Sequence, residues 1–139
     1  RNFSSGNGQS LTFEGALITK TNGINLGLLS LETNINNPLT RQKSIEEWNM
    51  EGTRKYTFMK PLYSSETITF SCNIQFENIE EKEILERTLK LYKFSEYCKN
   101  KDLNFKNFYW SNNKGFIWKS VQWIGRPNIK AEVTILKKE

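Results

Sequence analysis

The segment from Glu66 to Cys98 constrains the fold more than any other part of the chain. Its first third alternates apolar and polar residues with a period of two, which is typical of a strand with one face in solvent. The apolar positions of this strand are Ile68, Phe70, Cys72, Ile74 and Phe76. From Asn78 onward, a second apolar set recurs at helical spacing: Ile84, Leu85, Leu91, Tyr92 and Cys98. We therefore expect one amphipathic helix over about residues 78–99, packed on a mainly antiparallel sheet.

The start of this predicted helix has suitable end chemistry. Asn78 can cap the helix with Glu81 at the third helical position. Several neighbouring carboxylates oppose the positive end of the helix dipole. A catalytic pair of carboxylates would instead have to converge in a cleft with separated pKa values. We therefore interpret this acidic cluster as the start of a helix.

The chain of 139 residues is long enough for one domain without a disulfide or metal framework. Residues 1–10 are rich in Gly, Ser and Asn and predict a flexible N-terminal arm, which leaves 11–139 as a single β-rich domain. Weak periodicity over 36–61 predicts a long loop containing a short strand at Tyr56–Met59, although Ser44–Asn49 could form one helical turn. The expected fold class is α+β, with an antiparallel sheet, sandwich or barrel.

Two hairpins and a final strand complete the predicted sheet. The first hairpin joins Leu11–Thr19 to Ile24–Ile35 through the turn signal Asn22-Gly23. The second joins Phe105–Trp110 to Phe116–Ile124, and Asn113 or Gly115 can adopt positive φ in its turn. A last strand is expected over Ile129–Leu136.

The two cysteines and the absence of histidine bound the chemistry. Cys72 and Cys98 both fall on predicted core faces, where we expect buried thiols in a reducing compartment, with a strand-to-helix disulfide left as the alternative. A chain without histidine cannot build a Ser-His-Asp triad, a Cys-His dyad or a His-containing zinc site. Phosphate-binding glycine loops and calcium loops are also missing from the sequence. We expect no enzyme activity, no cofactor and no metal.

The C-terminal third is basic and aromatic, which opens one binding hypothesis. The net charge of +5 divides into +2 for residues 1–60, −3 for 61–98 and +6 for 99–139. Interleaved aromatic and lysine side chains over 105–123 could stack and hold single-stranded nucleic acid. The candidate residues are Lys106, Tyr109, Trp110, Lys114, Trp118 and Lys119. The alternative is that the aromatics fill the core and the lysines form a solvated face.

In element order, the chain resembles the tail-tube and distal-tail proteins of long-tailed bacteriophages and the tubes of contractile injection systems. The resemblance covers about Leu11–Lys137: an opening hairpin, a loop with Glu51-Gly52, the long strand Glu66–Phe76, one helix and the closing strands. It implies a structural virion protein of the tail tube, distal tail or baseplate. No apolar run approaches the roughly 18 residues of a membrane helix, and no signal peptide is visible.

The same resemblance implies the partners and the location. Subunits would close into a ring, a hexamer by analogy, around a channel for DNA, and would contact other tail or baseplate proteins. The ring would be assembled in the host cytoplasm and would reside in the virion tail. Trp48, Met50 and Tyr63 are the expected subunit-interface anchors, since aromatic residues usually occupy interface centres.

Overall fold

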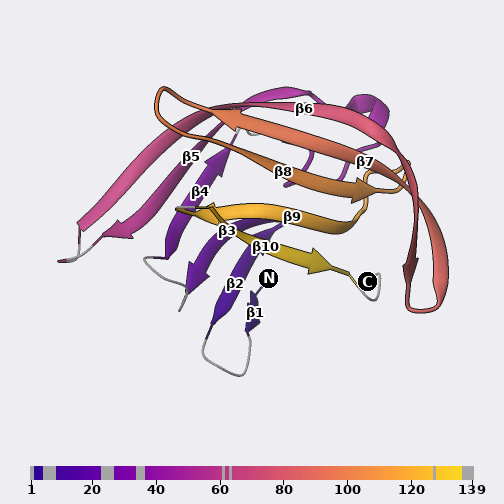
Figure 1. Cartoon of the computed structure of the whole chain (residues 1–139), viewed down its shortest axis with the longest axis horizontal. Coiled ribbons are helices and arrows are strands. Elements are labelled where there is room, and N and C mark those ends of the chain that lie inside the picture. Colours follow the sequence, from indigo (N-terminus) through magenta and orange to yellow (C-terminus); the bar gives the residue numbers. More distant parts are fainter. Residues whose placement is uncertain are drawn as a thin grey trace.

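The fold is built almost entirely from antiparallel strands, as Figure 1 shows for the computed structural model. The structure describes residues 2–4, 9–22, 27–33, 37–60, 62, 64–126 and 128–135. Within these ranges, the helical structure is limited to a 3-10 turn, η1 (Ile45–Glu47). The antiparallel sheet of the sequence prediction is therefore confirmed, and its helix is wrong.

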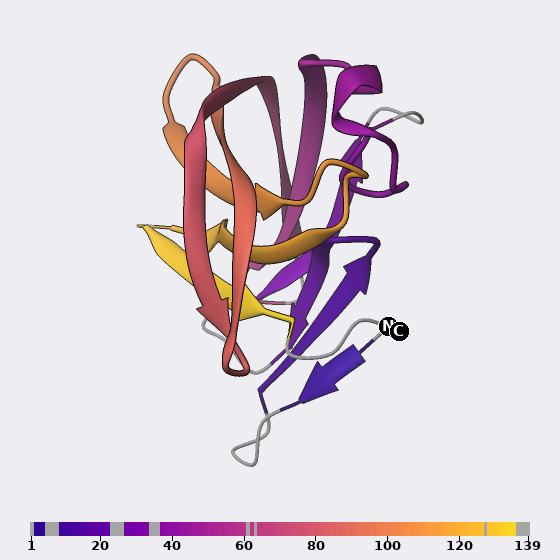
Figure 2. The same ribbon diagram turned by 90° about the vertical axis from the view of Figure 1, so that its right-hand side faces the viewer.

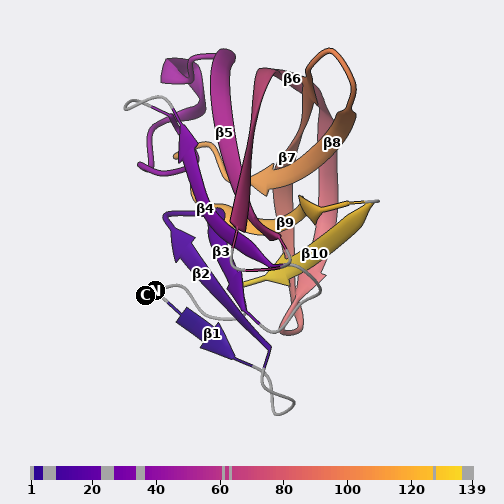
Figure 3. The same ribbon diagram turned by 90° about the vertical axis from the view of Figure 1, so that its left-hand side faces the viewer.

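The strands form two sheets. The small sheet has the order β1-β2-β3, with β1 (Asn2–Ser4), β2 (Ser10–Glu14) and β3 (Leu17–Asn22). The large sheet has the order β10-β9-β8-β7-β6-β5-β4. Its strands are β4 (Leu28–Thr33), β5 (Glu51–Lys60), β6 (Ser64–Ile84), β7 (Arg87–Lys99), β8 (Asn104–Ser111), β9 (Ile117–Gly125) and β10 (Ile129–Thr134). Figures 2 and 3 show the large sheet curling into half of a barrel, with the small sheet beside it.

The segment predicted as a helix forms instead the end of β6 and all of β7. These strands pair antiparallel from Ser71↔Lys99 to Ile84↔Arg87, and in Figure 1 β6 arches over the top of the molecule before turning down at the right. A helix would bury one stripe of side chains, whereas this hairpin buries residues on both faces. Phe94 and Cys98 enter the main core on one face, and Leu91 packs against Trp110 on the other. Burial on both faces therefore favours the β-hairpin over the amphipathic helix.

The hairpin turn lacked a recognisable signal. Leu85 and Glu86 occupy it with φ of 50° and 62°. Two left-handed residues in a two-residue turn match the twist of the strands, but this geometry usually selects Asn or Gly. A Leu-Glu turn therefore cannot be distinguished from a helix in the sequence.

A β-bulge at Glu77 makes β6 change faces. The pairing passes from Phe76↔Phe94 to Asn78↔Lys93, which leaves Glu77 without an opposing residue. An extra residue in one strand reverses the alternation beyond it. Before the bulge, even-numbered residues such as Ile74 face the main core, and after it Ile84 lies on the opposite face with Trp110.

The main core lies inside the half-barrel and is aromatic. Trp123 stacks on Phe105 with ring centroids 4.3 Å apart, and Tyr56 meets Trp123 edge to face at 5.2 Å. Trp48, which follows η1, packs on Phe94 at 4.5 Å. The loop residues around Trp48 therefore close one side of this core.

A buried glutamine joins the two sheets. Gln122 on β9 donates from Nε2 to the carbonyl of Ala16 at 2.7 Å and accepts at Oε1 from the amide of Ile18 at 2.9 Å. Only 2% of Gln122 is exposed. Its amide thus completes hydrogen bonds that the edge strand β3 would otherwise leave open.

The strand expected at Tyr56–Met59 is part of the longer β5. The segment Leu11–Thr19 is not one strand, because it turns at Gly15 and spans parts of β2 and β3. The hairpin expected between Leu11–Thr19 and Ile24–Ile35 is wrong, since β3 pairs with β2 and β4 pairs with β5 in the other sheet. The alternative helical turn at Ser44–Asn49 corresponds to η1, but Ser44 makes no side-chain cap hydrogen bond. Within the predicted N-terminal arm 1–10, residues 2–4 form β1 and Ser10 begins β2, while residues 1 and 5–8 lie outside the described residues, as does Gly23 of the Asn22-Gly23 turn.

Candidate functional site

A cleft of about 340 Å³ opens where the small sheet meets β9 and β10. Its walls come from the β2–β3 turn, the segment after Asn37, the β8–β9 connection and the two last strands. The lining is mostly apolar, with three polar side chains among the residues described: Gln42, Lys119 and Ser120. This volume and composition fall in the range of small-molecule sites, about 300–1,000 Å³.

Two glycines allow the chain segments around the cleft to approach closely. Gly15 has φ +60°, and a Cβ there would lie 2.5 Å from the carbonyl oxygen of Leu39. Gly115 has φ +85°, and a Cβ there would lie 1.7 Å from the carbonyl oxygen of Lys43. Both positions require glycine for conformation and for space. The segment 38–43 therefore packs closely against Gly15 at one end and against Gly115 at the other.

Hydrogen bonds fix the same segments. The amide of Ala16 donates to the carbonyl of Leu39 at 2.8 Å, and Gln42 Nε2 donates to the carbonyl of Lys114 at 3.3 Å. In the β8–β9 connection, Asn112 Oδ1 accepts from the amides of Lys114 and Phe116 at 2.9 and 3.0 Å. The cleft wall is thus preorganised by hydrogen bonds from both backbone and side chains.

Beside the cleft, three lysines surround one tryptophan on the outer face of the large sheet. The Nζ atoms of Lys82, Lys93 and Lys119 lie 5.5, 5.4 and 5.2 Å from the centroid of Trp110. Glu80 accepts from the indole Nε1 of Trp110 at 3.3 Å. We call these five residues the Trp110 lysine cluster. Cation–π contacts of this kind orient ammonium groups over the ring.

Strand register explains how the cluster forms. Lys93, Trp110 and Lys119 are direct cross-strand neighbours on β7, β8 and β9. Lys82 and Glu80 join them on that face because they follow the bulge at Glu77. The hydrogen bond from Lys82, together with contacts to Trp110 and Lys93, lowers the pKa of Glu80 despite partial desolvation.

A buried ion pair lies on the inner face of the same sheet. Arg54 Nη2 on β5 and Glu96 Oε2 on β7 are 2.5 Å apart, with side chains 1% and 2% exposed. Glu96 Oε1 also accepts from Asn107 Nδ2 and Tyr109 Oη, each at 3.0 Å. Burial alone would lower the pKa of Arg54, but Glu96 and the nearby tyrosines outweigh it and raise that pKa. Burial also raises the pKa of Tyr56 and Tyr109.

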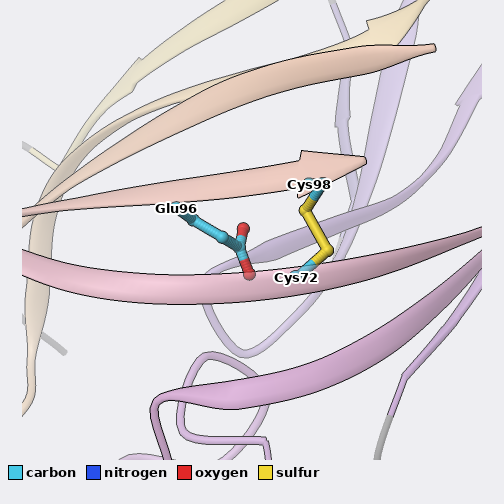
Figure 4. Close-up of side chains that lie close together, drawn as sticks. All are labelled: Cys72, Glu96 and Cys98. Atoms are coloured by element: carbon cyan, nitrogen blue, oxygen red, sulfur yellow. A yellow bond between two sulfur atoms is a disulfide. The ribbon is translucent and has the colours of Figure 1, made fainter. Parts of the chain in front are cut away.

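Cys72 and Cys98 form a disulfide next to Glu96, as Figure 4 shows. They are directly opposed on β6 and β7, with Cα atoms 4.1 Å apart. The expectation of two free thiols is therefore wrong, and the disulfide alternative is correct, although the bond joins two paired strands and not a strand and a helix. The two sulfurs and Glu96 form the one group of possible metal ligands found among the described residues. Disulfide sulfurs are not thiolates, so the group does not fit a metal as it stands.

The predicted nucleic-acid residues do not share one surface. Tyr109 points into the main core and is fully buried, whereas Trp110 and Trp118 lie on the opposite face and are 6% and 8% exposed. Lys106 is exposed on β8, and Lys114 is exposed in the β8–β9 connection. Only Trp110 and Lys119 of this set meet in the cluster described above.

Of the predicted interface anchors, Trp48 and Met50 both pack in or against the main core. Trp48 is 7% exposed and donates from Nε1 to the carbonyl of Lys43 at 3.0 Å, and Met50 is half-buried against the main core. Tyr63 lies outside the described residues. Burial within a single chain accounts for Trp48.

The sequence does not predict most of the cleft or three of the five residues of the Trp110 lysine cluster. It predicts positive φ at Asn113 or Gly115, and Gly115 adopts it, but nothing in the sequence indicates that Lys43 lies against Gly115. The sequence predicts a helix at Glu80, Lys82 and Lys93, and the approach of Glu80 and Lys82 to Trp110 depends on the bulge. The signal that could identify the hairpin is that residues 87–99 also fit a strand with apolar residues on both of its faces.

The comparisons with known proteins identify the class. A family model described as "Group 4 capsule polysaccharide lipoprotein gfcB, YjbF" matches residues 1–136. The chain therefore belongs to this family of bacterial capsule-related lipoproteins. A crystal structure of the hypothetical lipoprotein YmcC from Escherichia coli K12 is similar in fold, with a TM-score of 0.77, 20% sequence identity, and coverage of 94% of this chain and 68% of that one. No curated protein matches the chain.

These findings overturn the bacteriophage interpretation. The tail-tube, distal-tail and baseplate functions, the hexameric ring with its DNA channel and tail partners, and the virion location with assembly in a host cytoplasm are all wrong. The resemblance rested on an element order that included a helix, and that helix is a β-hairpin. The single-stranded nucleic-acid alternative is not supported either, since its residues lie on opposite faces. No helix in the described part of the chain is long and apolar enough to cross a membrane.

Proposed function

We propose that this chain is a non-catalytic binding domain of the bacterial cell envelope that holds a segment of capsule polysaccharide in the cleft between the two sheets. The observation that carries the proposal is the preorganised cleft of about 340 Å³ in a member of a capsule polysaccharide lipoprotein family. Sugar rings present apolar faces and hydroxyl edges, and this lining combines both kinds of partner. Phe116, Val133 and Ile135 supply apolar surface, and Gln42 and Lys119 supply donors.

The disulfide supports an envelope location. Disulfides persist in the bacterial periplasm and at the cell surface and are rare in the cytosol. The Cys72–Cys98 bridge ties the two longest strands of the sheet together. The description of the family as lipoproteins agrees with this location.

The chemistry of the lining supports binding without catalysis. No carboxylate or thiol is found among the described residues that line the cleft, and the chain has no histidine. The buried carboxylate of Glu96 is bound to Arg54 on the inner face of the sheet. General acid–base catalysis most often uses a histidine or a carboxylate within hydrogen-bond reach of the substrate, and the one titratable side chain among the described lining residues is Lys119.

A cleft-filling substitution tests this function. Val133 lines the cleft from β10, and we expect Val133→Trp to abolish binding of purified group 4 capsule oligosaccharide measured by isothermal titration calorimetry. Lys130→Trp is the matched control, because Lys130 is exposed on the other face of the same strand. Equal affinities for the wild type and Val133→Trp, at unchanged thermal stability, would exclude the cleft as the binding site.

A further inference from the structure

We propose that the Trp110 lysine cluster is a subsite for a carboxylate-bearing sugar, so that the polysaccharide held by this domain is acidic. The inference rests on the proposed function and assigns the chemical class of one unit of its ligand. It is carried by the geometry of three ammonium groups around one indole, and by their connection to the cleft.

The ammonium groups are close together and held in place. Each lies within 5.5 Å of the same ring centroid, so any two lie within about 11 Å of each other. This is near the Debye length of about 8–10 Å at moderate salt, so their fields add. The side chains of Lys82, Lys93 and Lys119 are only 33%, 27% and 25% exposed. Their alkyl stems are packed, and the charged ends remain at the surface.

The local carboxylates leave hydrogen-bond donors available. The Nζ atoms of Lys82 and Lys93 form ion pairs with the carboxylate of Glu80 at 3.1 and 3.6 Å. The Nζ atom of Lys119 pairs with Glu132 Oε1 at 3.1 Å. The side chain of Glu132 is 63% exposed, and an exposed pair of this kind is weak. Three lysines face two carboxylates, and each ammonium carries three donors. An incoming carboxylate would therefore meet a net positive charge from three ammonium groups gathered around one ring.

The cluster and the cleft are continuous. Lys119 contacts the ring of Trp110 and also lines the cleft. Phe116 and Ile135 likewise line the cleft and pack in the same hydrophobic cluster as Trp110. A polysaccharide lying in the cleft would therefore meet Lys119 first and then Lys82 and Lys93 on the other sides of Trp110.

The surroundings favour an acidic glycan over an anionic membrane. A bilayer surface recruits fully exposed basic side chains, whereas these three are packed against aromatic rings. The exposed residues of the same hairpin are mixed in charge, with Glu81, Glu83 and Glu86 next to Arg87 and Lys90, so the hairpin offers no uniformly basic surface to anionic headgroups.

The test uses oligogalacturonate as the acidic probe and dextran of equal length as the neutral control. In ¹H–¹⁵N spectra, the indole signal of Trp110, assigned with Trp110→Phe, should shift with oligogalacturonate and not with dextran. Affinity should fall about tenfold in the double variant Lys82→Gln/Lys93→Gln, since each lysine would contribute one partly exposed ion pair and such pairs are individually weak. Lys106→Gln is the matched control, because Lys106 is exposed on β8 outside the cluster.

A second variant tests the same idea in the opposite direction. Glu80→Gln removes the carboxylate that occupies Lys82 and Lys93, so affinity for oligogalacturonate should rise. Unchanged affinity in the double lysine variant, or equal binding of dextran, would overturn the inference, as would binding to vesicles of anionic phospholipid alone. Failure of the proposed function has a different signature: Val133→Trp would leave binding intact while the lysine variants weaken it.

Discussion

Gly115 supports the cleft wall, and replacing it should destabilise the protein by a predictable amount. An alanine there would keep a backbone with φ +85°, which is unfavourable for an L-residue by roughly 1–2 kcal/mol. Its Cβ would lie 1.7 Å from the carbonyl oxygen of Lys43, so the backbone around Lys43 must move. That movement weakens the bonds from Ile45 to Asn113 and from Gln42 to Lys114, each with a net contribution of about 0.5–1.5 kcal/mol. We expect Gly115→Ala to lose about 2–5 kcal/mol.

Two other glycines separate the cost of positive φ from the cost of the close approach to a neighbouring segment. Gly27 has φ +46° but only ordinary contacts, since a Cβ there would lie 3.6 Å from the carbonyl oxygen of Thr21, so Gly27→Ala should lose only about 1–2 kcal/mol. Gly125 does not have positive φ, and its Cβ would meet Phe58 at an ordinary 3.8 Å. Gly125→Ala should therefore be neutral or stabilising by about 0.5 kcal/mol.

Urea unfolding followed by tryptophan fluorescence measures this series. The loss of unfolding free energy should increase from Gly125→Ala to Gly27→Ala to Gly115→Ala, with similar slopes against urea concentration. Equal stabilities for the Gly125 and Gly115 variants would refute the argument from close approach. Binding in the cleft should be lost only with Gly115→Ala, because the cleft is lined by Gly115 and not by the other two.

The two remaining predictions concern charged side chains. Glu96→Gln should lose about 3–5 kcal/mol of unfolding free energy, because it leaves Arg54 charged and buried without its partner. The double variant Arg54→Met/Glu96→Gln should lose less, and an equal loss in both variants would contradict a cost due to the unpaired charge. The lowered pKa of Glu80 means that its ion pairs stabilise the fold above the ordinary glutamate pKa and are lost as pH falls through the lower folded value. The urea midpoint of Glu80→Gln should therefore vary less with pH than that of the wild type below about pH 4.5, and parallel pH profiles would contradict this assignment.

The aromatic hairpin was predictable because its determinants are local. Residues 105–124 combine alternating apolar residues with a turn at Asn112–Gly115, and the structure has β8 and β9 there. Gly115 also adopts the positive φ expected of it. A local pattern and a local turn residue agree in this segment, so the prediction did not depend on distant contacts.

The segment 78–99 shows the limit of such reasoning. Its apolar residues fit a helical stripe, and Asn78 with Glu81 fits a helix start, yet both belong to β6. What overrides these local signals is the pairing of residues 78–84 with 87–93 and of residues 92–99 with β8, together with burial on both faces. Helix propensity is a weak preference, and tertiary context routinely outweighs it.

The sequence by itself determined a mainly antiparallel β domain, a core containing Cys72 and Cys98, and a chemistry without histidine. These follow from composition and from period-two alternation, which depend on neighbours along the chain. Only the tertiary structure decided that the cysteines bond, that the bulge at Glu77 carries Lys82 to Trp110, and that two glycines seat segment 38–43 at the cleft. The physical reason is that register, bulges and close approaches are set by residues far apart in the chain, whose contacts no local pattern encodes.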